Sequence, residues 1–339
     1  MKDKKERKYQ AILNILAKTD HLLSSSKITE QLRAQGYDIS ERTVRYYLSM
    51  MKFKGHIESD GKKGCLITEP GIKETQSCLG IEKVGFLSAR IDQMTYRMNF
   101  NLAKRSGTVV VNVSLLEAPS VQKAATLISS MFREQYAMGR LIGLFPPLSK
   151  LGDLTIPRNM FGIGTVCSIT LNGVMLSHGI PTVSRFGGIL EIKDKKPARF
   201  TEIIMYEGTS LDPIEIFIKS RMTDYIGVAT TGNGRIVVGF REFPADSRDK
   251  IMELAGQLEN AGLGKFMMVG WPSQPLLDIP VSEGRIGAII VGGLNPLAIL
   301  EESKLHLSSR AMSGVVEYDT LFPYWELEER IKSMSSISR

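Results

Sequence analysis

The strongest constraint on the fold is an internal repeat, in which similar segments recur about 123–127 residues apart along the chain. Gly107–Val111 resembles Gly234–Val238, and Leu171–Gly173 resembles Leu294–Pro296. Each copy has the pattern of a strand, a helix, a second strand, a glycine-rich strand, a Leu-Asn turn into a short helix, and a final strand. The repeat predicts two similar α/β halves, neither of which need be stable alone, packed into one pseudo-symmetric domain.

The repeat also sets the expected domain boundaries. Copies at about residues 84–220 and 221–332 predict one duplicated α/β domain at residues 84–332. Residues 69–83 are expected to form a linker, and residues 1–68 a separate N-terminal domain. The fold class predicted for the whole chain is α/β (α+β).

The net charge of +7 is concentrated in the N-terminal domain. Of the 43 basic and 36 acidic residues, residues 1–68 hold 14 and 8, a net charge of +6, and the remaining 29 and 28 leave +1. An excess confined to one fifth of the chain indicates a basic module joined to a nearly neutral one.

The N-terminal domain has the element order of a winged helix-turn-helix. An apolar stripe predicts a first helix over Lys4–Lys18, Ser25 or Ser26 is placed to cap a second helix, and Ser40 precedes a third. Two short strands then flank Gly61-Lys62-Lys63-Gly64, whose glycines permit a hairpin with two lysines at its tip. In this arrangement the third helix enters the DNA major groove, and the wing approaches phosphates or the minor groove.

The third predicted helix has an apolar and a polar face. Val44, Leu48 and Met51 recur at helical spacing and are expected in the core, whereas Arg42 and Arg45 lie on the opposite face. These arginines are candidates for bidentate contact with guanine, and the wing lysines would add salt-sensitive affinity for phosphates. The predicted contacts to double-stranded operator DNA are Glu41, Arg42, Thr43, Arg45, Tyr46, Ser49, Lys52, Lys62 and Lys63.

The duplicated domain carries polar side chains on glycine-rich loops but no recognisable catalytic motif. Gly162-Ile163-Gly164 and Gly232-Asn233-Gly234 do not complete a dinucleotide-binding fingerprint, and neither a phosphate-binding loop nor a nucleophile elbow is present. Histidines, cysteines and carboxylates show no metal-ligand or acid–base spacing, so the sequence predicts no enzyme, metal or cofactor. A small anionic effector would need arginine and hydroxyl donors on loops between the halves. The candidate ligand-binding residues are Thr165, Ser168, Asn172, His178, Arg185, Asn295 and Arg310.

The sequence further predicts a cytoplasmic protein with no membrane partner. Its longest apolar stretches, such as Ile286–Leu294, are far shorter than the roughly 20 residues that span a bilayer. Met1–Arg7 carries mixed charges and lacks the apolar segment of a signal peptide. Three cysteines without paired spacing are typical of reduced thiols.

Taken together, these segments resemble the NrpR family, the nitrogen-regulatory transcriptional repressors of methanogenic archaea. The resemblance rests on Ser40–Leu48 and the Lys62-Lys63 wing, joined to Gly162–Cys167, Gly179–Thr182 and Phe186–Gly188. It covers nearly the whole chain, and the combination is much more specific than the Arg/Tyr helix alone.

The resemblance implies a repressor that binds palindromic operators of nitrogen-fixation and nitrogen-assimilation genes. The resemblance also implies that residues 84–332 are an effector domain for ligand sensing and oligomerisation. In that family 2-oxoglutarate binds the effector domain and weakens the DNA complex, so 2-oxoglutarate is the expected effector. Some members carry two effector domains in tandem, whereas this chain has one. The implied partners are a second copy, in a homodimer or larger oligomer, and a second effector-domain chain or a PII-type signalling protein.

On this interpretation, the 2-oxoglutarate dianion would bridge the glycine-rich loops through Arg185 with Thr165 or Ser168. Its binding would change the spacing of two winged helices across a dimer. Two other interpretations stay open. A bifunctional enzyme–repressor of the biotin-ligase type would need a Gly-Arg-Gly-Arg adenylate loop, which the sequence lacks, and the winged helix could instead dock protein or RNA.

Overall fold

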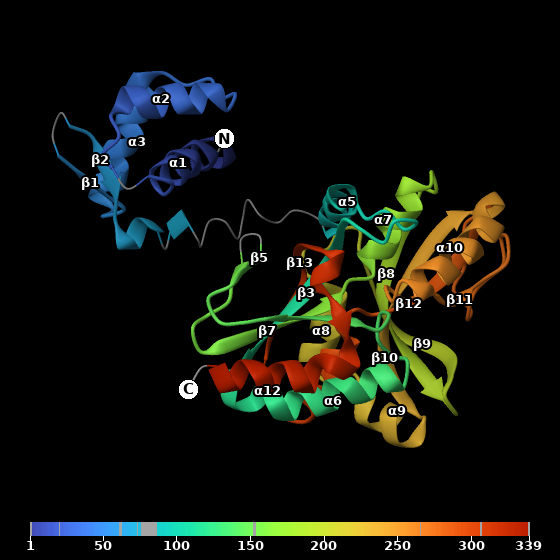
Figure 1. Cartoon of the computed structure of the whole chain (residues 1–339). Helices are drawn as coiled ribbons and strands as arrows, with labels where there is room; N and C mark the ends of the chain where they lie inside the picture. The colour runs from blue at the N-terminus through green and yellow to red at the C-terminus, as the bar shows by residue number, and fades with distance from the viewer. Residues whose placement is uncertain are drawn as a thin grey trace. The chain divides into compact units, whose positions relative to one another are not determined.

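The chain divides into two compact units, Met1–Gly85 and Phe86–Arg339 (Figure 1). The computed structural model describes residues 2–19, 21–60, 63–72, 74–75, 87–151, 154–264, 266–305 and 307–337. Within these ranges, no helix combines the length and the apolar character that crossing a bilayer would require.

Unit 1 contains the predicted winged helix. Its elements are α1 (Lys2–Leu16), α2 (Ser25–Ala34), α3 (Glu41–Phe53), β1 (Ile57–Ser59) and β2 (Cys65–Ile67). The two strands pair antiparallel to form the wing. Three helices followed by a hairpin confirm the order expected from the sequence.

Serine caps and an apolar core explain the two later helices. Ser24 Oγ accepts from the Lys27 N–H at 3.4 Å, so the cap of α2 lies one residue before the predicted position. Ser40 Oγ accepts from the Thr43 N–H at 3.2 Å and caps α3 as predicted. Val44 of α3 is fully buried, which leaves the opposite face of the helix to solvent.

Unit 2 runs through the same series of elements twice. After α5 (Leu87–Arg97), the first copy consists of β3 (Thr108–Glu117), α6 (Val121–Arg133), β4 (Leu141–Phe145), β7 (Met160–Val166), α7 (Ile169–Ser177) and β8 (Val183–Lys193). The second copy consists of β10 (Gly234–Pro244), α10 (Arg248–Asn260), β11 (Phe266–Val269), β12 (Arg285–Val291), α11 (Asn295–Glu302) and β13 (Ser308–Glu317). The other elements are β5 (Lys150–Leu151), β6 (Leu154–Thr155), β9 (Lys196–Met205), α8 (Pro213–Lys219), α9 (Tyr225–Thr231), β14 (Phe322–Pro323) and α12 (Leu327–Ile337). This order confirms the predicted duplication.

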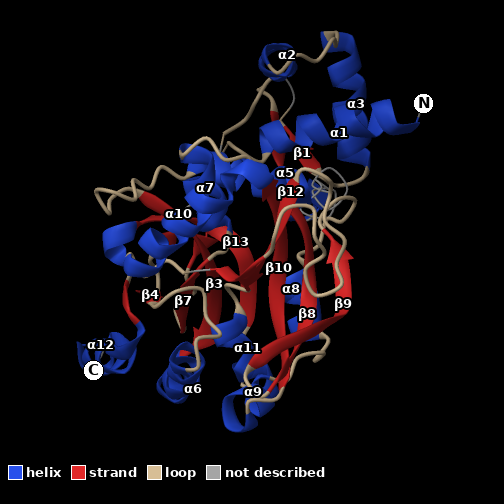
Figure 2. Ribbon diagram, turned by 90° about the vertical axis from the view of Figure 1, so that its right-hand side faces the viewer, coloured by secondary structure: helices blue, strands red, loops and turns tan. Residues whose placement is uncertain are grey.

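The two copies exchange their final strands. β8, the last strand of the first copy, pairs antiparallel with β10, and β13 pairs in the same way with β3. The resulting five-stranded sheets have the orders β13-β3-β7-β4-β14 and β11-β12-β10-β8-β9 (Figure 2). Helices α6, α9, α11 and α12 contribute to one apolar core, and α5, α7 and α10 to a second. Neither copy can therefore complete its sheet alone.

The hydrogen bonds to the Val110 and Val237 carbonyls show that the alignment of Leu171–Gly173 with Leu294–Pro296 is shifted by two residues. Val110 of β3 and Val237 of β10 occupy equivalent positions in the two ladders. The Val110 carbonyl accepts from Thr170 Oγ1 at 3.1 Å, and the Val237 carbonyl accepts from Asn295 Nδ2 at 3.0 Å. Thr170 is therefore the counterpart of Asn295. Asn172, which shares the Leu-Asn letters, lies two residues further along.

The chain crosses itself closely where the two copies meet, and Gly293 permits the crossing. A Cβ atom at this position would lie 2.4 Å from the Val166 carbonyl oxygen and 2.5 Å from Asn112 Nδ2. Val166 and Asn112 belong to the first copy, whereas Gly293 belongs to the second. The first of these neighbours is a backbone atom within a sheet, so it cannot simply turn aside.

We expect Gly293→Ala to destabilise unit 2 by about 1–3 kcal/mol, the usual cost of overpacking. Gly256→Ala in α10 is the matched control, because its added Cβ meets no atom within 4 Å. Removing a helix-interior glycine should stabilise the protein by about 0.5–1 kcal/mol. Urea denaturation monitored by circular dichroism measures both free energies, and equal stability of the two variants would contradict the close crossing.

Candidate effector pocket and DNA-contact face

The exposed side of α3 carries an arginine that is already held in place. Arg45 Nη2 lies 2.7 Å from Glu41 Oε1, and Arg45 Nε donates to Ser25 Oγ at 3.2 Å. Ser25 Oγ in turn donates to Glu41 Oε1 at 2.8 Å. The Ser25 hydrogen bond and then the Arg45 guanidinium lower the pKa of Glu41 from its ordinary value. This network joins α2 to α3 and restricts the direction of the Arg45 side chain.

The other predicted DNA contacts lie along the same helix or in the wing. Tyr46 is 59% exposed and contacts Tyr47 edge-on, with ring centroids 5.8 Å apart. Lys63 pairs with Asp60 at 3.2 Å. Phe53, which the sequence did not indicate, is 94% exposed at the end of α3. Arg42, Ser49 and Lys52 are exposed, Thr43 is half-buried beside the Ser40 cap, and Lys62 lies outside the described residues.

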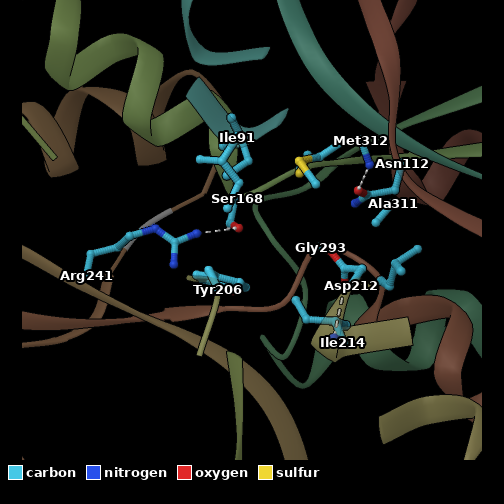
Figure 3. Close-up of a pocket in the computed structure, with 13 residues that line it drawn as sticks. Ile91, Asn112, Ser168, Tyr206, Asp212, Ile214, Arg241, Gly293, Ala311 and Met312 are labelled. Atoms are coloured by element: carbon cyan, nitrogen blue, oxygen red, sulfur yellow. Dashed lines mark hydrogen bonds between the residues drawn. The ribbon is translucent and has the colours of Figure 1, made fainter. Parts of the chain in front are cut away.

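A narrow pocket opens in unit 2 where the two copies meet, at the beginnings of α7 and α11 (Figure 3). Its cavity volume is about 20 Å³, roughly the room that one water molecule needs, so the pocket is nearly closed in this structure. Apolar lining comes from Ile91 of α5, among others. The polar side chains that line it are Asn112, Ser168, Tyr206, Asp212 and Arg241.

Arg241 of β10 is the cation of this pocket and is only 1% exposed. Its guanidinium donates to Asn172 Oδ1 at 3.3 Å, the Phe240 carbonyl at 3.2 Å and Ser168 Oγ at 3.4 Å. Among the described residues, no carboxylate oxygen lies within 4.0 Å of a guanidinium nitrogen of Arg241. Buried charges are normally paired, so a guanidinium held only by long bonds to neutral acceptors is prepared for an anion.

A glycine two residues earlier on β10 makes room for this guanidinium. A Cβ atom at Gly239 would lie 2.8 Å from Arg241 Nη1. On the other side, the Arg241 guanidinium carbon is 5.3 Å from the centroid of the Tyr206 ring. The cation therefore lies between the strand backbone and an aromatic side chain.

Burial changes the titration of the groups around Arg241. It raises the pKa of the Cys167 thiol to about 12 and also raises the pKa of Tyr206. Both groups are therefore protonated at neutral pH, and the Tyr206 hydroxyl can donate a hydrogen bond.

Asp212 is the acidic group of the pocket. Its carboxylate accepts from the N–H groups of Ile214 at 2.9 Å and Glu215 at 3.2 Å. Burial, followed by the nearby Glu215 carboxylate, raises the pKa of Asp212 to about 6. Asp212 therefore titrates close to physiological pH.

Of the predicted ligand residues, Ser168 lines the pocket, and Asn172 lies behind it as an acceptor for Arg241. Thr165 is buried in β7, with its Oγ1 3.5 Å from Asn112 Nδ2. Asn295 is buried and engaged by the Tyr225 hydroxyl at 2.6 Å and by Val237. Of these four residues, Ser168 faces the pocket, and the other three side chains are buried beside or behind its lining.

The remaining three predicted ligand residues lie elsewhere. Arg185 forms an ion pair with the buried carboxylate of Glu242 and also contacts Ser282. His178 ends α7, where its Nδ1 is 2.8 Å from the Val174 carbonyl. Arg310 is exposed on β13.

Sequence reasoning missed Arg241, Tyr206 and Asp212. A signal for Arg241 exists in the sequence, because Arg241-Glu242 interrupts the apolar run that begins at Ile236 and ends at Phe243. Charged side chains are almost never fully buried unless a partner neutralises them, so two charged residues within a buried strand indicate an ion pair or a binding site. Tyr206 and Asp212 follow β9 in a loop, and no pattern places them beside β10.

Comparison with known proteins adds to this geometry. Residues 84–322 match the family model described as NrpR regulatory domains NRD1 and 2, and residues 10–75 match the model of the ribonuclease R winged-helix domain. A nitrogen repressor-like protein of known structure from Methanococcus jannaschii superposes with a TM-score of 0.60 at 26% identity. That match covers 70% of this chain and 98% of the other.

Curated relatives are regulators by name. The chain is 33% identical to the global nitrogen regulator NrpRI of Methanosarcina mazei, over 93% of this chain and 97% of the relative. It is 28% identical to the global nitrogen regulator NrpR of Methanocaldococcus jannaschii over 93% of its own length, but it spans only 55% of that protein. With a family model matched over most of its length and a relative matched end to end, the chain belongs to the NrpR family of nitrogen regulators.

Proposed function

We propose that this protein is a transcriptional repressor of nitrogen-fixation and nitrogen-assimilation genes. Unit 1 binds palindromic operator DNA, and 2-oxoglutarate bound to unit 2 releases it. The names of the relatives and the winged helix support the first part. The observation that carries the second part is Arg241, a buried cation without a carboxylate partner among the described residues. This function needs no catalytic group, and it places the protein in the cytoplasm with the DNA.

The face of α3 supplies the DNA contacts. Arg45 is oriented by Glu41 and Ser25, which reduces the entropy it loses on binding a guanine. Arg42 is exposed and reaches the same groove, while Lys63 in the wing neutralises a phosphate once it leaves Asp60. Two copies in a dimer would present two such helices to the half-sites of a palindrome.

The pocket beside Arg241 supplies the effector contacts. A carboxylate of 2-oxoglutarate would replace the long bonds to neutral acceptors with charge-assisted bonds. The hydroxyls of Ser168 and Tyr206 and the amide of Asn112 offer further donors. This proposal moves the principal ligand contact from Arg185, which is committed to Glu242, to Arg241.

Release of the DNA follows from linkage. An effector changes an equilibrium only by binding one arrangement of the protein more tightly than the other. We propose that occupancy of the pocket favours an arrangement of the dimer in which the two winged helices no longer match the half-site spacing.

Arg42→Ala should weaken binding to the operator by about 1–3 kcal/mol, because it removes a candidate base contact. The readout is fluorescence anisotropy of a labelled palindromic duplex that the full chain has selected from random DNA. Lys63→Ala should instead weaken all duplexes alike and reduce the salt dependence. Equal affinity for a duplex RNA of the same sequence would favour the RNA-docking interpretation.

Arg241→Met should weaken 2-oxoglutarate binding by at least about 30-fold, the equivalent of losing one charge-assisted hydrogen-bond pair of about 2 kcal/mol. It should lower the melting temperature only modestly, because it removes a donor from neutral acceptors and leaves no buried carboxylate without an ion-pair partner among the described residues. Arg185→Met is the control: it removes the cation that pairs with the buried Glu242 and should lower the melting temperature while the affinity for 2-oxoglutarate is unchanged. Calorimetry that finds wild-type affinity in Arg241→Met would remove this residue from the effector site.

Binding of the dianion should be coupled to protonation of Asp212. An ionised Asp212 repels the ligand, so the affinity is highest when this group is protonated and falls as the pH rises above its pKa of about 6. We expect the Kd to increase several-fold between pH 6 and pH 7.5. In Asp212→Asn, which keeps the acceptor for the α8 N–H groups, this dependence should be lost. An unchanged pH profile in that variant would show that another group is titrating.

A further inference from the structure

One wall of the pocket is a three-residue bulge in β13, at a position where β8 of the first copy pairs regularly; the bulge of β8 lies beside that position, at Arg185. Opposite Asn112, β13 places the three residues of Ala311–Ser313, whereas β8 places the single residue Gly187 opposite Gly239. Within this bulge Met312 has a positive φ of 47°. Ala311 and Met312 both line the pocket. The insertion therefore shapes the pocket wall on one side of the pseudo-symmetric domain.

Side chains from three different elements hold the bulge. The Ala311 N–H donates to Glu215 of α8, and the Met312 N–H donates to Asn112 Oδ1 of β3 at 3.0 Å. Arg90 of α5 donates from one nitrogen, Nη2, to both carbonyls, at 2.9 Å for Ala311 and 3.2 Å for Met312. The bulge is thus fastened by side chains instead of the regular ladder, and Arg90 ties it to α5.

The same helix also contacts the opposite wall. Ile91, next to Arg90, lines the pocket directly. Met98, just after α5, packs on Gly173 of α7, where a Cβ atom would lie 2.1 Å from Met98 Sδ. Because α7 begins beside Ser168, α5 contacts both the bulge and the helix whose start binds Arg241.

Helix α5 also lies next to the segment of the chain that connects the two units. It is the first described helix of unit 2, and residues 76–86 connect it to the last described residues of unit 1. In the chain, α5 is therefore the described helix of unit 2 nearest to the winged helix.

We propose that Arg90 is a positioning residue that couples occupancy of the effector pocket to the movement of α5. The inference rests on the proposed effector site. The narrow pocket has to widen to admit a dianion beside Arg241. The bulge is the part of the wall that moves first, because its residues have no backbone hydrogen-bond partners in the β13–β3 pairing. When the bulge moves, the carbonyls of Ala311 and Met312 move with it. Arg90 is hydrogen-bonded to both carbonyls, so its side chain follows them and displaces α5. Arg90 does not need to touch the ligand.

The test separates ligand binding from coupling in the full-length chain. Calorimetry gives the Kd for 2-oxoglutarate, and anisotropy gives the Kd for the operator duplex with and without saturating 2-oxoglutarate. The ratio of the two DNA constants measures the coupling. The variants are Arg90→Met, Arg90→Lys, which keeps a donor for one carbonyl, and Arg97→Met, an exposed control on the same helix.

Arg90→Met should bind 2-oxoglutarate within about threefold of the wild type, while its coupling ratio falls at least about tenfold towards one, a loss of about 1.4 kcal/mol. Arg90→Lys should recover part of the ratio, and Arg97→Met should leave it unchanged. Hydrogen exchange of the 87–97 amides should respond to 2-oxoglutarate in the wild type and not in Arg90→Met.

A wild-type coupling ratio in Arg90→Met, with ligand affinity retained, would overturn the role of Arg90 and leave the effector site standing. If wild-type protein neither binds 2-oxoglutarate nor releases DNA in its presence, the proposed function itself fails, and the inference fails with it. If Arg90→Met loses ligand affinity as well as coupling, and Arg90→Lys restores both together, Arg90 belongs to the binding site and the positioning role is wrong.

Discussion

The exchange of final strands between the two copies is the constraint on which the rest of unit 2 depends. Because β8 completes the sheet of the second copy and β13 that of the first, the chain must pass twice through the junction between them. The passage brings the starts of α7 and α11 together, and Gly293 is needed there because a Cβ atom would collide with the Val166 carbonyl oxygen. The candidate effector pocket lies at this crossing, so it needs residues of both copies.

The frame is symmetric, but the chemistry placed on it is not. At the position that corresponds to Arg241, the first copy has Ser114, a buried hydroxyl that bonds Ser309. At the position of Gly239, which leaves space for the guanidinium, the first copy has Asn112, whose side chain holds the bulge. Duplication thus provides the junction, and the difference between the copies places a buried arginine and a three-residue bulge of the second copy at this pocket.

Several elements could be predicted from the sequence because their signals are local. Ser40 caps α3, Val44 faces the core, and the duplicated order of strands and helices appears as predicted. The Leu-Asn match between the copies was wrong in its register, since Thr170 takes the place of Asn295. A hydroxyl and an amide can bind the same carbonyl, so similarity of letters did not identify equivalent positions.

By itself, the sequence determined the two-unit organisation, the winged helix and the duplication, because charge distribution, helical spacing and repeated segments are properties of neighbouring residues. Only the tertiary structure decided which arginine is available to an anion. Arg185 and Arg241 both lie in apolar strands. Arg185 pairs with the buried carboxylate of Glu242, whereas Arg241 contacts only neutral acceptors among the residues that the structure describes. That difference depends on residues brought together by the exchanged strands, and the electrostatics of a buried charge are set by such distant partners.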